Sequence, residues 1–244
     1  MDNRLNILGV GVDTYTMEEA TSFLVSSIEE ERCARVYTPN SEIILYAYKN
    51  PEYCDVLNRA ELITPDGIGV VYASKILGRP LKERVSGFDL ANKLLEKIAP
   101  QGKSVYLFGG KPGIAERAAE KIKKLYPGIK IAGCSDGYFD EQKEKEIIED
   151  INEKSPDVLF VCLGFPKQEC WIDAHSDISA RVMMGIGGSL DVFAGEVKRA
   201  PVFFQKSGLE WFYRLVKQPS RFIRMLALPK FGFTVLFKGR KFLK

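Results

Sequence analysis

The sequence has no run of 18 or more apolar residues, which is the length that a membrane-spanning helix requires. Its first twenty residues lack the basic start and the apolar stretch of a secretory signal peptide. The five cysteines are scattered and form no CxxC pair, so neither a disulfide framework nor a zinc site is indicated. We therefore expect a cytoplasmic protein with reduced thiols.

Several motifs of common enzymes are also missing. The chain has no GxxxxGK[ST] phosphate loop, no GxSxG nucleophile motif and no DxD pair. The only histidine, His175, lies in a polar helical stretch and is expected at the surface. No compact group of acidic residues and histidine suggests a metal. We predict no metal and no cofactor, so lysine, arginine and backbone N–H groups would have to neutralise any bound diphosphate.

The charge of the chain is unevenly distributed. The whole chain of 244 residues carries a net charge of +3, but residues 196–244 hold twelve Lys or Arg and only two Glu, which leaves −7 for the remainder. The same tail holds ten aromatic residues. A hydrophobic content of 45% is typical of a soluble globular protein. The change in composition near residue 196 predicts a domain boundary there.

Between residues 34 and 196, apolar strand-like segments alternate with segments of helical periodicity. Strands that are apolar almost throughout favour a parallel sheet covered on both faces. We predict an α/β fold with a mostly parallel, Rossmann-like sheet, helices on both faces, and a basic, aromatic and helical C-terminal appendage. The expected strands are 34–40, 61–67, 104–110, 130–137, 157–164 and 180–188, and the expected helices are 41–50, 68–78, 87–99, 113–128, 141–155, 166–175 and 189–196.

Polar or glycine-containing loops follow the expected strands. In a doubly wound sheet, ligands bind at the carboxyl ends of the strands, where such loops lead into helices. Glycine permits close approach of the backbone, and helix N-termini attract phosphate. Any single loop could equally be a turn or a cap, but together they favour a polar ligand pocket. The loops are 38–40, 64–67, 109–113, 135–138, 164–169 and 187–191.

One loop pattern resembles a dinucleotide fingerprint only weakly. GGKPG (109–113) follows a strand and precedes a helix, and Asp136 ends the next strand. The pattern is G-G-x-x-G rather than G-x-G-x-x-G, so the signal for a dinucleotide is weak. A nucleotide-binding regulatory or redox module that uses this loop remains an alternative. A thermal-shift comparison of NAD and ADP with UDP would test whether the chain is such a module or binds a different nucleotide.

Seven motifs follow one another along the chain. They are TPN (38–40), TPDG (64–67), RVSGFDL (84–90), LFGG (107–110), GFPKQE (164–169), GIGGSLDVFAGEVKRAP (185–201) and GLEWFYRL (208–215). Together they resemble the WecG/TagA/CpsF family of bacterial glycosyltransferases. The resemblance covers nearly the whole chain in order, and the tail is most similar to the teichoic-acid branch. It implies transfer of N-acetylmannosamine from a UDP donor to the 4-hydroxyl of a lipid-linked N-acetylglucosamine, although another UDP sugar, such as UDP-N-acetylmannosamine uronate, remains an alternative donor.

The reaction that the resemblance implies needs one general base. The resemblance implies an α-linked UDP sugar as donor and a β-linked product, so the configuration at the anomeric carbon is inverted. A single displacement achieves this inversion without a carboxylate that acts as a nucleophile. Asp66 fits the role of the base, because it lies at a strand end among apolar neighbours that would bring its pKa towards the working pH. The alternative is that Asp66 caps the helix expected at 68–78.

The resemblance also suggests the residues that bind substrate. Donors to the diphosphate would come from the glycine turns and Gln168. Asp191 would accept ribose hydroxyls, Thr38 and Asn40 would bind the sugar, and Arg84 would position the acceptor or a phosphate. Helix-start and turn chemistry is the alternative for Gln168, Asp191, Thr38 and Asn40. The complete substrate-binding set is Thr38, Asn40, Arg84, Gly109, Gly110, Asp136, Gln168, Gly187, Gly188 and Asp191.

The basic tail predicts a peripheral contact with the inner face of the plasma membrane. Residues 1–195 would form the core, with about 1–100 as the acceptor and catalytic half and 101–195 as the nucleotide-sugar half, and 196–244 would be the appendage. Arg214, Arg221 and Arg224 are expected near the lipid diphosphate, with contact to headgroups or solvent only as the alternative. A nucleic-acid arm is less favoured because the tail also carries many aliphatic residues. A homo-oligomer is left open.

Overall fold

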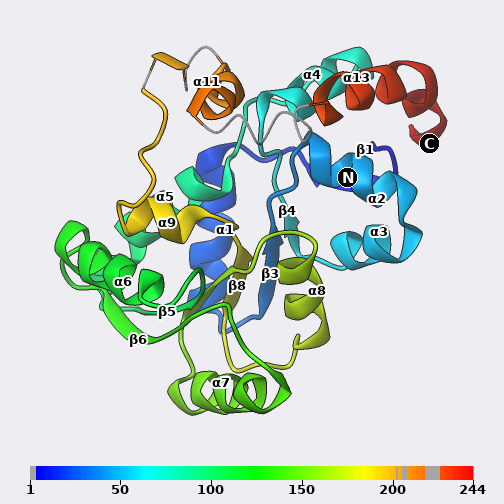
Figure 1. Ribbon diagram of the computed structural model, residues 1–244. Helices are drawn as coiled ribbons and strands as arrows, with labels where there is room; N and C mark the ends of the chain where they lie inside the picture. Colours follow the sequence, from blue (N-terminus) through cyan, green and yellow to red (C-terminus); the bar gives the residue numbers. More distant parts are fainter. Residues whose placement is uncertain (1–3, 202, 205–207, 218–225, 244) are drawn as a thin grey trace.

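The computed structural model describes residues 4–201, 203–204, 208–217 and 226–243. Its centre is a six-stranded sheet in the order β4-β3-β8-β7-β5-β6, in which every neighbouring pair is parallel (Figure 1). The predicted α/β class with a parallel sheet is confirmed. The strands are β3 (Ala34–Tyr37), β4 (Leu62–Ile63), β5 (Ser104–Gly109), β6 (Lys130–Ser135), β7 (Val158–Cys162) and β8 (Val182–Gly185).

The central strands are buried on both faces. Every residue of β7 and β8 is buried, and β5 is buried from Val105 onward. Side chains of a strand point alternately to the two faces, so a strand covered on both sides needs apolar residues at every position. This explains the continuous apolar runs in the sequence, whereas β6, at the edge of the sheet, is only partly buried.

Helices cover both faces of the sheet, and each face has its own apolar cluster. In α5, for example, Leu90, Leu94 and Ile98 recur at intervals of four and face the sheet, while the Ser86 hydroxyl accepts the Asp89 N–H at the helix start. One face carries α1 (Met17–Glu29), α5 (Gly87–Ile98), α6 (Ile114–Leu125) and α9 (Ser189–Phe193), and the other carries α2 (Ser41–Lys49), α3 (Pro51–Asn58), α4 (Ile68–Ile76), α7 (Glu141–Lys154) and α8 (Lys167–Ala174).

The connections reverse direction between neighbouring strands. The strands β5 and β7 are adjacent, yet α6 leaves β5 toward one face and α8 leaves β7 toward the other. The same reversal separates α2, after β3, from α9, after the adjacent β8. Such reversals open a crevice outside the carboxyl ends of the strands, which is where ligands bind in doubly wound sheets.

A β-hairpin that the sequence patterns did not reveal lies beside the edge strand β4. It pairs β1 (Arg4–Ile7) with β2 (Val10–Asp13) through a two-residue turn, in which Leu8 and Gly9 both have positive φ. The Asp13 carboxylate accepts the Ile63 N–H at 2.8 Å and pairs with Arg4 at 3.1 Å. Burial raises the pKa of Asp13, against the lowering effect of these two partners.

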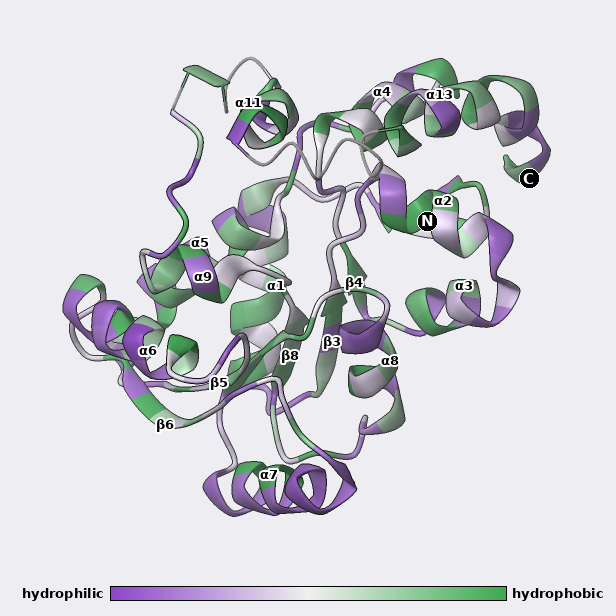
Figure 2. Cartoon of the chain, in the orientation of Figure 1, coloured by the Kyte–Doolittle hydropathy of each residue, from purple (hydrophilic) through white to green (hydrophobic). Residues whose placement is uncertain are grey.

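The C-terminal region is helical, as predicted. It contains α11 (Glu210–Lys217), α13 (Ala227–Lys238) and the short helix η3 (Gly239–Phe242). Helix α13 lies beside α4 (Figure 2) and packs against α2 and α4. Its Phe231 and Val235 enter the apolar cluster of that face. Phe233 and Phe237 are 64% and 75% exposed. Within the described ranges, no helix is long and apolar enough to span a bilayer.

Candidate functional site

The loops after β3, β4 and β8 meet at the carboxyl edge of the sheet. The Asp66 N–H donates to the carbonyl of Pro39 at 3.3 Å, and the Thr38 hydroxyl donates to the carbonyl of Gly185 at the same distance. The segment before α5 joins them, because the Val85 N–H donates to the carbonyl of Pro65 at 3.1 Å. These contacts bring together segments that are far apart in the sequence.

Asp66 is half-buried between the start of α4 and the start of α5. Its Oδ2 accepts the N–H of Gly87, the first residue of α5, at 3.4 Å. Gly67, with φ of +93°, is the N-cap residue of α4. The N-terminus of α5 holds the Asp66 carboxylate by an N–H group and by the positive end of the helix dipole.

The neighbouring polar residues occupy the same strand ends. The Asn40 Oδ1 accepts the N–H groups of Glu42 and Ile43, so the capping alternative for Asn40 is confirmed. The Thr64 hydroxyl is buried and has no hydrogen-bond partner among the described residues. Sequence reasoning quoted Thr64 within the loop 64–67 but assigned it no role. It follows β4, which is in register with β3, the strand that precedes Thr38.

Arg84 links this cluster to the C-terminal region. Its guanidinium contacts Glu210 of α11 at 3.2 Å and Asp89 of α5 at 3.3 Å. Asp89 also pairs with Arg199 at 2.6 Å, and Arg199 stacks 4.9 Å over the ring of Phe88. Burial opposes ionisation of Asp89, but the hydrogen bonds with Arg199 and its other partners lower its pKa overall. The ion pairs therefore fasten the chain after residue 196 next to the Asp66 loop.

The loops after β5 and β6 form a second cluster. Gly109 has φ of +126°, and a Cβ there would lie 2.4 Å from the carbonyl oxygen of Cys162, so only glycine fits. Gly110 accepts the Gly137 N–H at 2.9 Å. Asp136 receives the Lys143 ammonium at 2.9 Å and the Tyr138 N–H at 2.8 Å. Burial opposes ionisation of Asp136, but Lys143 leads the contacts that lower its pKa overall.

Gln168 joins the loops after β7 and β8. Its Oε1 accepts the Gly164 N–H at 3.1 Å and the Gly187 N–H at 3.0 Å, and its side chain is buried. Gly188 is the N-cap of α9 and Asp191 lies in the first turn of that helix. The Asp191 carboxylate makes no hydrogen bond or ion pair with any residue that the structure describes, so it is available to a ligand.

Behind Gln168 lies a buried polar network that sequence reasoning missed. Glu169 is 1% exposed and its carboxylate accepts from Gln168 Nε2 at 2.8 Å and from the Tyr53 hydroxyl at 3.0 Å. The Tyr37 hydroxyl donates to the backbone carbonyl of Glu169 at 3.2 Å. Burial raises the pKa of Glu169. The only signal in the sequence that Glu169 is buried was its position three residues before the apolar Ile172, which puts both residues on the same face of α8.

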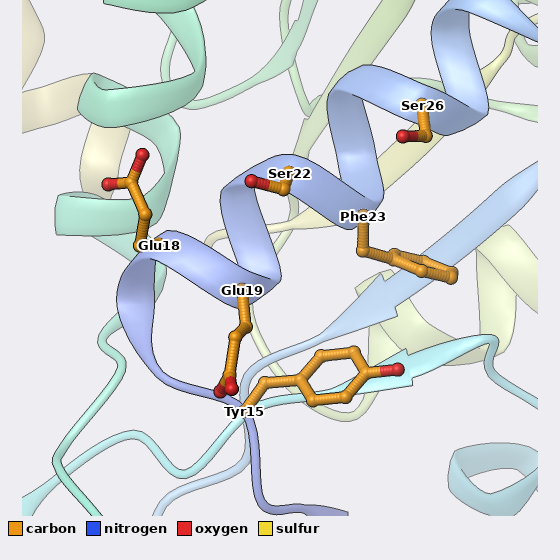
Figure 3. A pocket seen from close by; sticks show the side chains of 6 residues that line it. All are labelled: Tyr15, Glu18, Glu19, Ser22, Phe23 and Ser26. Atoms are coloured by element: carbon orange, nitrogen blue, oxygen red, sulfur yellow. The ribbon is translucent and has the colours of Figure 1, made fainter.

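Other parts of the surface lie apart from these loops. A pocket of about 440 Å³ on α1 is lined by Tyr15, Glu18, Glu19, Ser22, Phe23 and Ser26 (Figure 3). Its two glutamates pair with lysines, Glu19 with Lys82 at 2.8 Å. A second, apolar groove of about 400 Å³ lies between α4 and α13 and is lined by Ile76, Leu77, Val235, Leu236, Phe237 and Arg240. No predicted site residue lines either pocket.

The three tail arginines are not placed. Arg221 and Arg224 lie outside the described residues, and Arg214 belongs to α11 but its side chain is not described.

Within the described ranges, no three His, Cys, Asp or Glu side chains are grouped closely enough to hold a metal ion. The structure thus places the remaining predicted residues in three groups at the carboxyl edge of the sheet: around Asp66, in the loops after β5 and β6, and around Gln168.

The sheet and its loops define a doubly wound α/β protein, the class in which nucleotides bind outside the carboxyl ends of the strands. Within this class, the chain belongs to the glycosyl transferase WecG/TagA/CpsF family, whose model matches residues 5–244. The family predicted from the sequence motifs is confirmed.

Several similar proteins are named N-acetylglucosaminyldiphosphoundecaprenol N-acetyl-beta-D-mannosaminyltransferase. One from Bacillus spizizenii is 43% identical over 223 residues, which cover 89% of this chain and 86% of that protein. One from Bacillus subtilis (strain 168) is 40% identical, covering 91% of this chain and 88% of that protein. One from Staphylococcus aureus (strain MRSA252) is 36% identical, covering 99% of this chain and 95% of that protein.

Proposed function

We propose that this protein transfers N-acetylmannosamine from its UDP derivative to the 4-hydroxyl of N-acetylglucosamine on undecaprenyl diphosphate. The product is the β(1→4)-linked disaccharide of the wall teichoic acid linkage unit. The names of relatives at 36% to 43% identity support the acceptor and the transferred sugar. The observation that carries the chemistry is the half-buried Asp66 carboxylate, which follows β4 at the carboxyl edge of the sheet and accepts the N–H of Gly87 at 3.4 Å.

The proposed reaction is one displacement at the anomeric carbon. The acceptor oxygen forms a bond to that carbon while the bond to the β-phosphate oxygen breaks, and UDP leaves with the electron pair. Asp66 takes the proton of the attacking hydroxyl, which is the work of a general base. The α5 N–H group at 3.4 Å keeps one carboxylate oxygen in place. No second carboxylate has to act as a nucleophile in an inverting transfer.

The nucleotide half of the donor would lie over the ends of β5, β7 and β8. The loop Gly109–Gly110 leads into the N-terminus of α6, where free N–H groups and the helix dipole favour phosphate. The carboxylate of Asp191 would accept the ribose hydroxyls. Gly187 and Gly188 would set the backbone beside the ligand, and Gln168 would contribute through the loops it joins. Asp136 borders this region from β6.

The acceptor sugar would lie next to Asp66. Asn40 would offer the amide nitrogen that helix capping leaves over, and Thr38 its hydroxyl. Arg84 would position the sugar or a phosphate, since Asp89 and Glu210 hold its guanidinium in a fixed direction. N–H groups and arginines would stabilise the negative charge that develops on the diphosphate of the leaving UDP. That this needs no metal stays a prediction.

The C-terminal region would contact the inner face of the plasma membrane, where the acceptor resides. Its net charge of +10 favours anionic lipid, and apolar side chains such as Phe212 and Phe237 are exposed. The contact between Arg84 and Glu210 ties α11 to the site. We retain the prediction that at least one of Arg214, Arg221 and Arg224 binds the lipid diphosphate. The localisation would thus be cytoplasmic and peripheral.

The test is a transfer assay with purified protein, UDP-N-acetylmannosamine and a soluble lipid-diphosphate-sugar acceptor, run with and without EDTA. Asp66→Asn should lose about 10²–10⁴-fold in turnover, because a positioned base contributes that much. UDP should still raise its melting temperature. The matched control is Asp177→Asn, an exposed aspartate, which should keep full activity. Near-normal turnover in Asp66→Asn would refute the assignment, and loss of activity in EDTA would refute metal independence.

A further inference from the structure

Glu169 carries an almost fully buried carboxylate. It lies close to the carboxyl edge of the sheet, where the ligand would bind, but it does not face that edge. Its two oxygens have separate partners: Oε1 accepts from Gln168 Nε2 at 2.8 Å and Oε2 accepts from the Tyr53 hydroxyl at 3.0 Å. Tyr53 belongs to α3, so the carboxylate also joins α3 to α8. The proposed reaction does not use this group.

The geometry of Gln168 explains what the carboxylate does. The amide has one accepting end and one donating end, and both Gly164 and Gly187 present N–H donors to it. Only the oxygen can satisfy those two donors, so the nitrogen must point the other way. There it meets Oε1 of Glu169, which accepts its hydrogen bond at 2.8 Å. The carboxylate therefore selects one of the two orientations of the amide.

Gln168 has little freedom to find another arrangement. A Cβ on Gly185 would lie 3.0 Å from its Nε2, so the side chain fits closely against the end of β8. The two glycines that it bonds have positive φ, +75° for Gly164 and +54° for Gly187. Backbone of this kind is held by its hydrogen bonds because glycine has no side chain to pack. One amide oxygen thus fixes two loops that lead into α8 and α9.

We propose that Glu169 is a positioning residue for the nucleotide-sugar site, in which its carboxylate orients the Gln168 amide and thereby fixes the glycine loops after β7 and β8. The ligand named here rests on the proposed function, whereas the link from Glu169 to the two loops does not. Glu169 itself touches no substrate, because it is 1% exposed.

The competing explanation is that Glu169 only stabilises the fold by joining α3 to α8. The free energy of burying the Glu169 carboxylate opposes this explanation. Burial raises the pKa of Glu169. The carboxyl group therefore does not reduce the stability of the protein below its ordinary pKa of 4.5, and it reduces that stability fully above the raised pKa of the folded state. Wherever the folded protein holds Glu169 ionised, the buried charge lowers the stability of the protein relative to a neutral residue of the same shape. Glu169→Gln should be at least as stable as wild type at neutral pH.

The experiment measures amide hydrogen exchange of Gly164 and Gly187 in the ¹⁵N-labelled full chain, together with KM and kcat for the UDP sugar. In Glu169→Ala, exchange at both glycines should rise about tenfold or more and KM should rise about tenfold, with kcat little changed, as expected for lost hydrogen bonds that position a binding loop. Glu169→Gln should restore both values, because its side-chain oxygen still accepts from Gln168.

Tyr53→Phe is the matched control. It removes the other hydrogen bond to the same carboxylate, so it should reduce stability but leave the exchange of Gly164 and Gly187 unchanged. If Glu169→Ala does not fold, Gln168→Ala tests the second step of the link, from the amide to the glycines, because it deletes the amide and should release Gly164 and Gly187.

Unchanged exchange at Gly164 and Gly187 in Glu169→Ala, or in Gln168→Ala where that variant is needed, would overturn the proposal. Equal loosening of both glycines in Tyr53→Phe would also overturn it, since the carboxylate would then act only on the fold. Failure of the wild-type protein to transfer the sugar would refute the proposed function instead, while the exchange data would still decide the role of Glu169.

Discussion

Helix α13 should stabilise the protein core, and Phe231 offers a direct test. Phe231 is 2% exposed and packs in the cluster that includes α2 and α4, whereas Phe233, two residues along the same helix, is 64% exposed. Replacing a buried phenylalanine by alanine costs about 3–5 kcal/mol, from lost burial and the cavity left behind. An exposed one should change stability by no more than about 0.5 kcal/mol. In a chain of this size the buried change should lower Tm by roughly 10 °C.

The assay is thermal unfolding of the full chain followed by circular dichroism, for Phe231→Ala and Phe233→Ala side by side. Both variants lose the same side chain from the same helix, so helix propensity and hydropathy change equally. Equal shifts for the two variants would show that α13 is not docked as described. A large shift for Phe231→Ala alone would also mean that deleting the C-terminal region removes part of the core.

Two further predictions concern the surface and the ion pairs of the C-terminal region. Replacing the exposed Phe233 and Phe237 together by alanine should reduce flotation of the protein with anionic vesicles and leave its circular dichroism unchanged; undiminished flotation would contradict a membrane contact through α13. Asp89→Asn should destabilise the protein at pH 7, because Arg199 and its other partners lower the pKa of Asp89. The stabilisation by the ionised Asp89 carboxylate is fully present above its ordinary pKa of 3.8 and is lost as the pH falls through the lowered pKa of the folded state. Wild type and Asp89→Asn should therefore become equally stable in acid. A difference in stability that persists in acid would refute the ionic explanation.

The order of elements between residues 34 and 196 could be predicted because buried parallel strands give continuous apolar runs. The first 33 residues gave weaker signals. Strands β1 and β2 have four residues each, and their Leu8–Gly9 turn lacks the Asn-Gly or Asp-Gly pair that marks hairpins. Helix α1 does carry a recognisable capping box, in which Thr16 and Glu19 bond each other's backbone. Helix α3 follows α2 after one residue, so the two resemble one segment.

The loops of the candidate site could be predicted because the fold puts strand ends at one edge. Their connections could not. Arg199 meets Asp89 across 110 positions of sequence, and nothing local to either residue indicates the pair. Glu169 reads as a surface residue, since a buried carboxylate is recognisable only by the partners that the fold brings to it. The tail showed its charge and aromatic content, but composition does not distinguish Phe231, which packs inward, from Phe233, which does not.

The hairpin next to β4 determines where the sheet ends. Among the described residues, strand β4 pairs with a strand on one side only, and the Asp13 carboxylate accepts the Ile63 N–H that a further strand would bond. An incoming strand from another molecule would have to displace a buried anion that is itself held by Arg4. This edge is therefore closed to the strand pairing through which exposed sheets aggregate or exchange segments. Any strand pairing between two molecules would have to use a different edge.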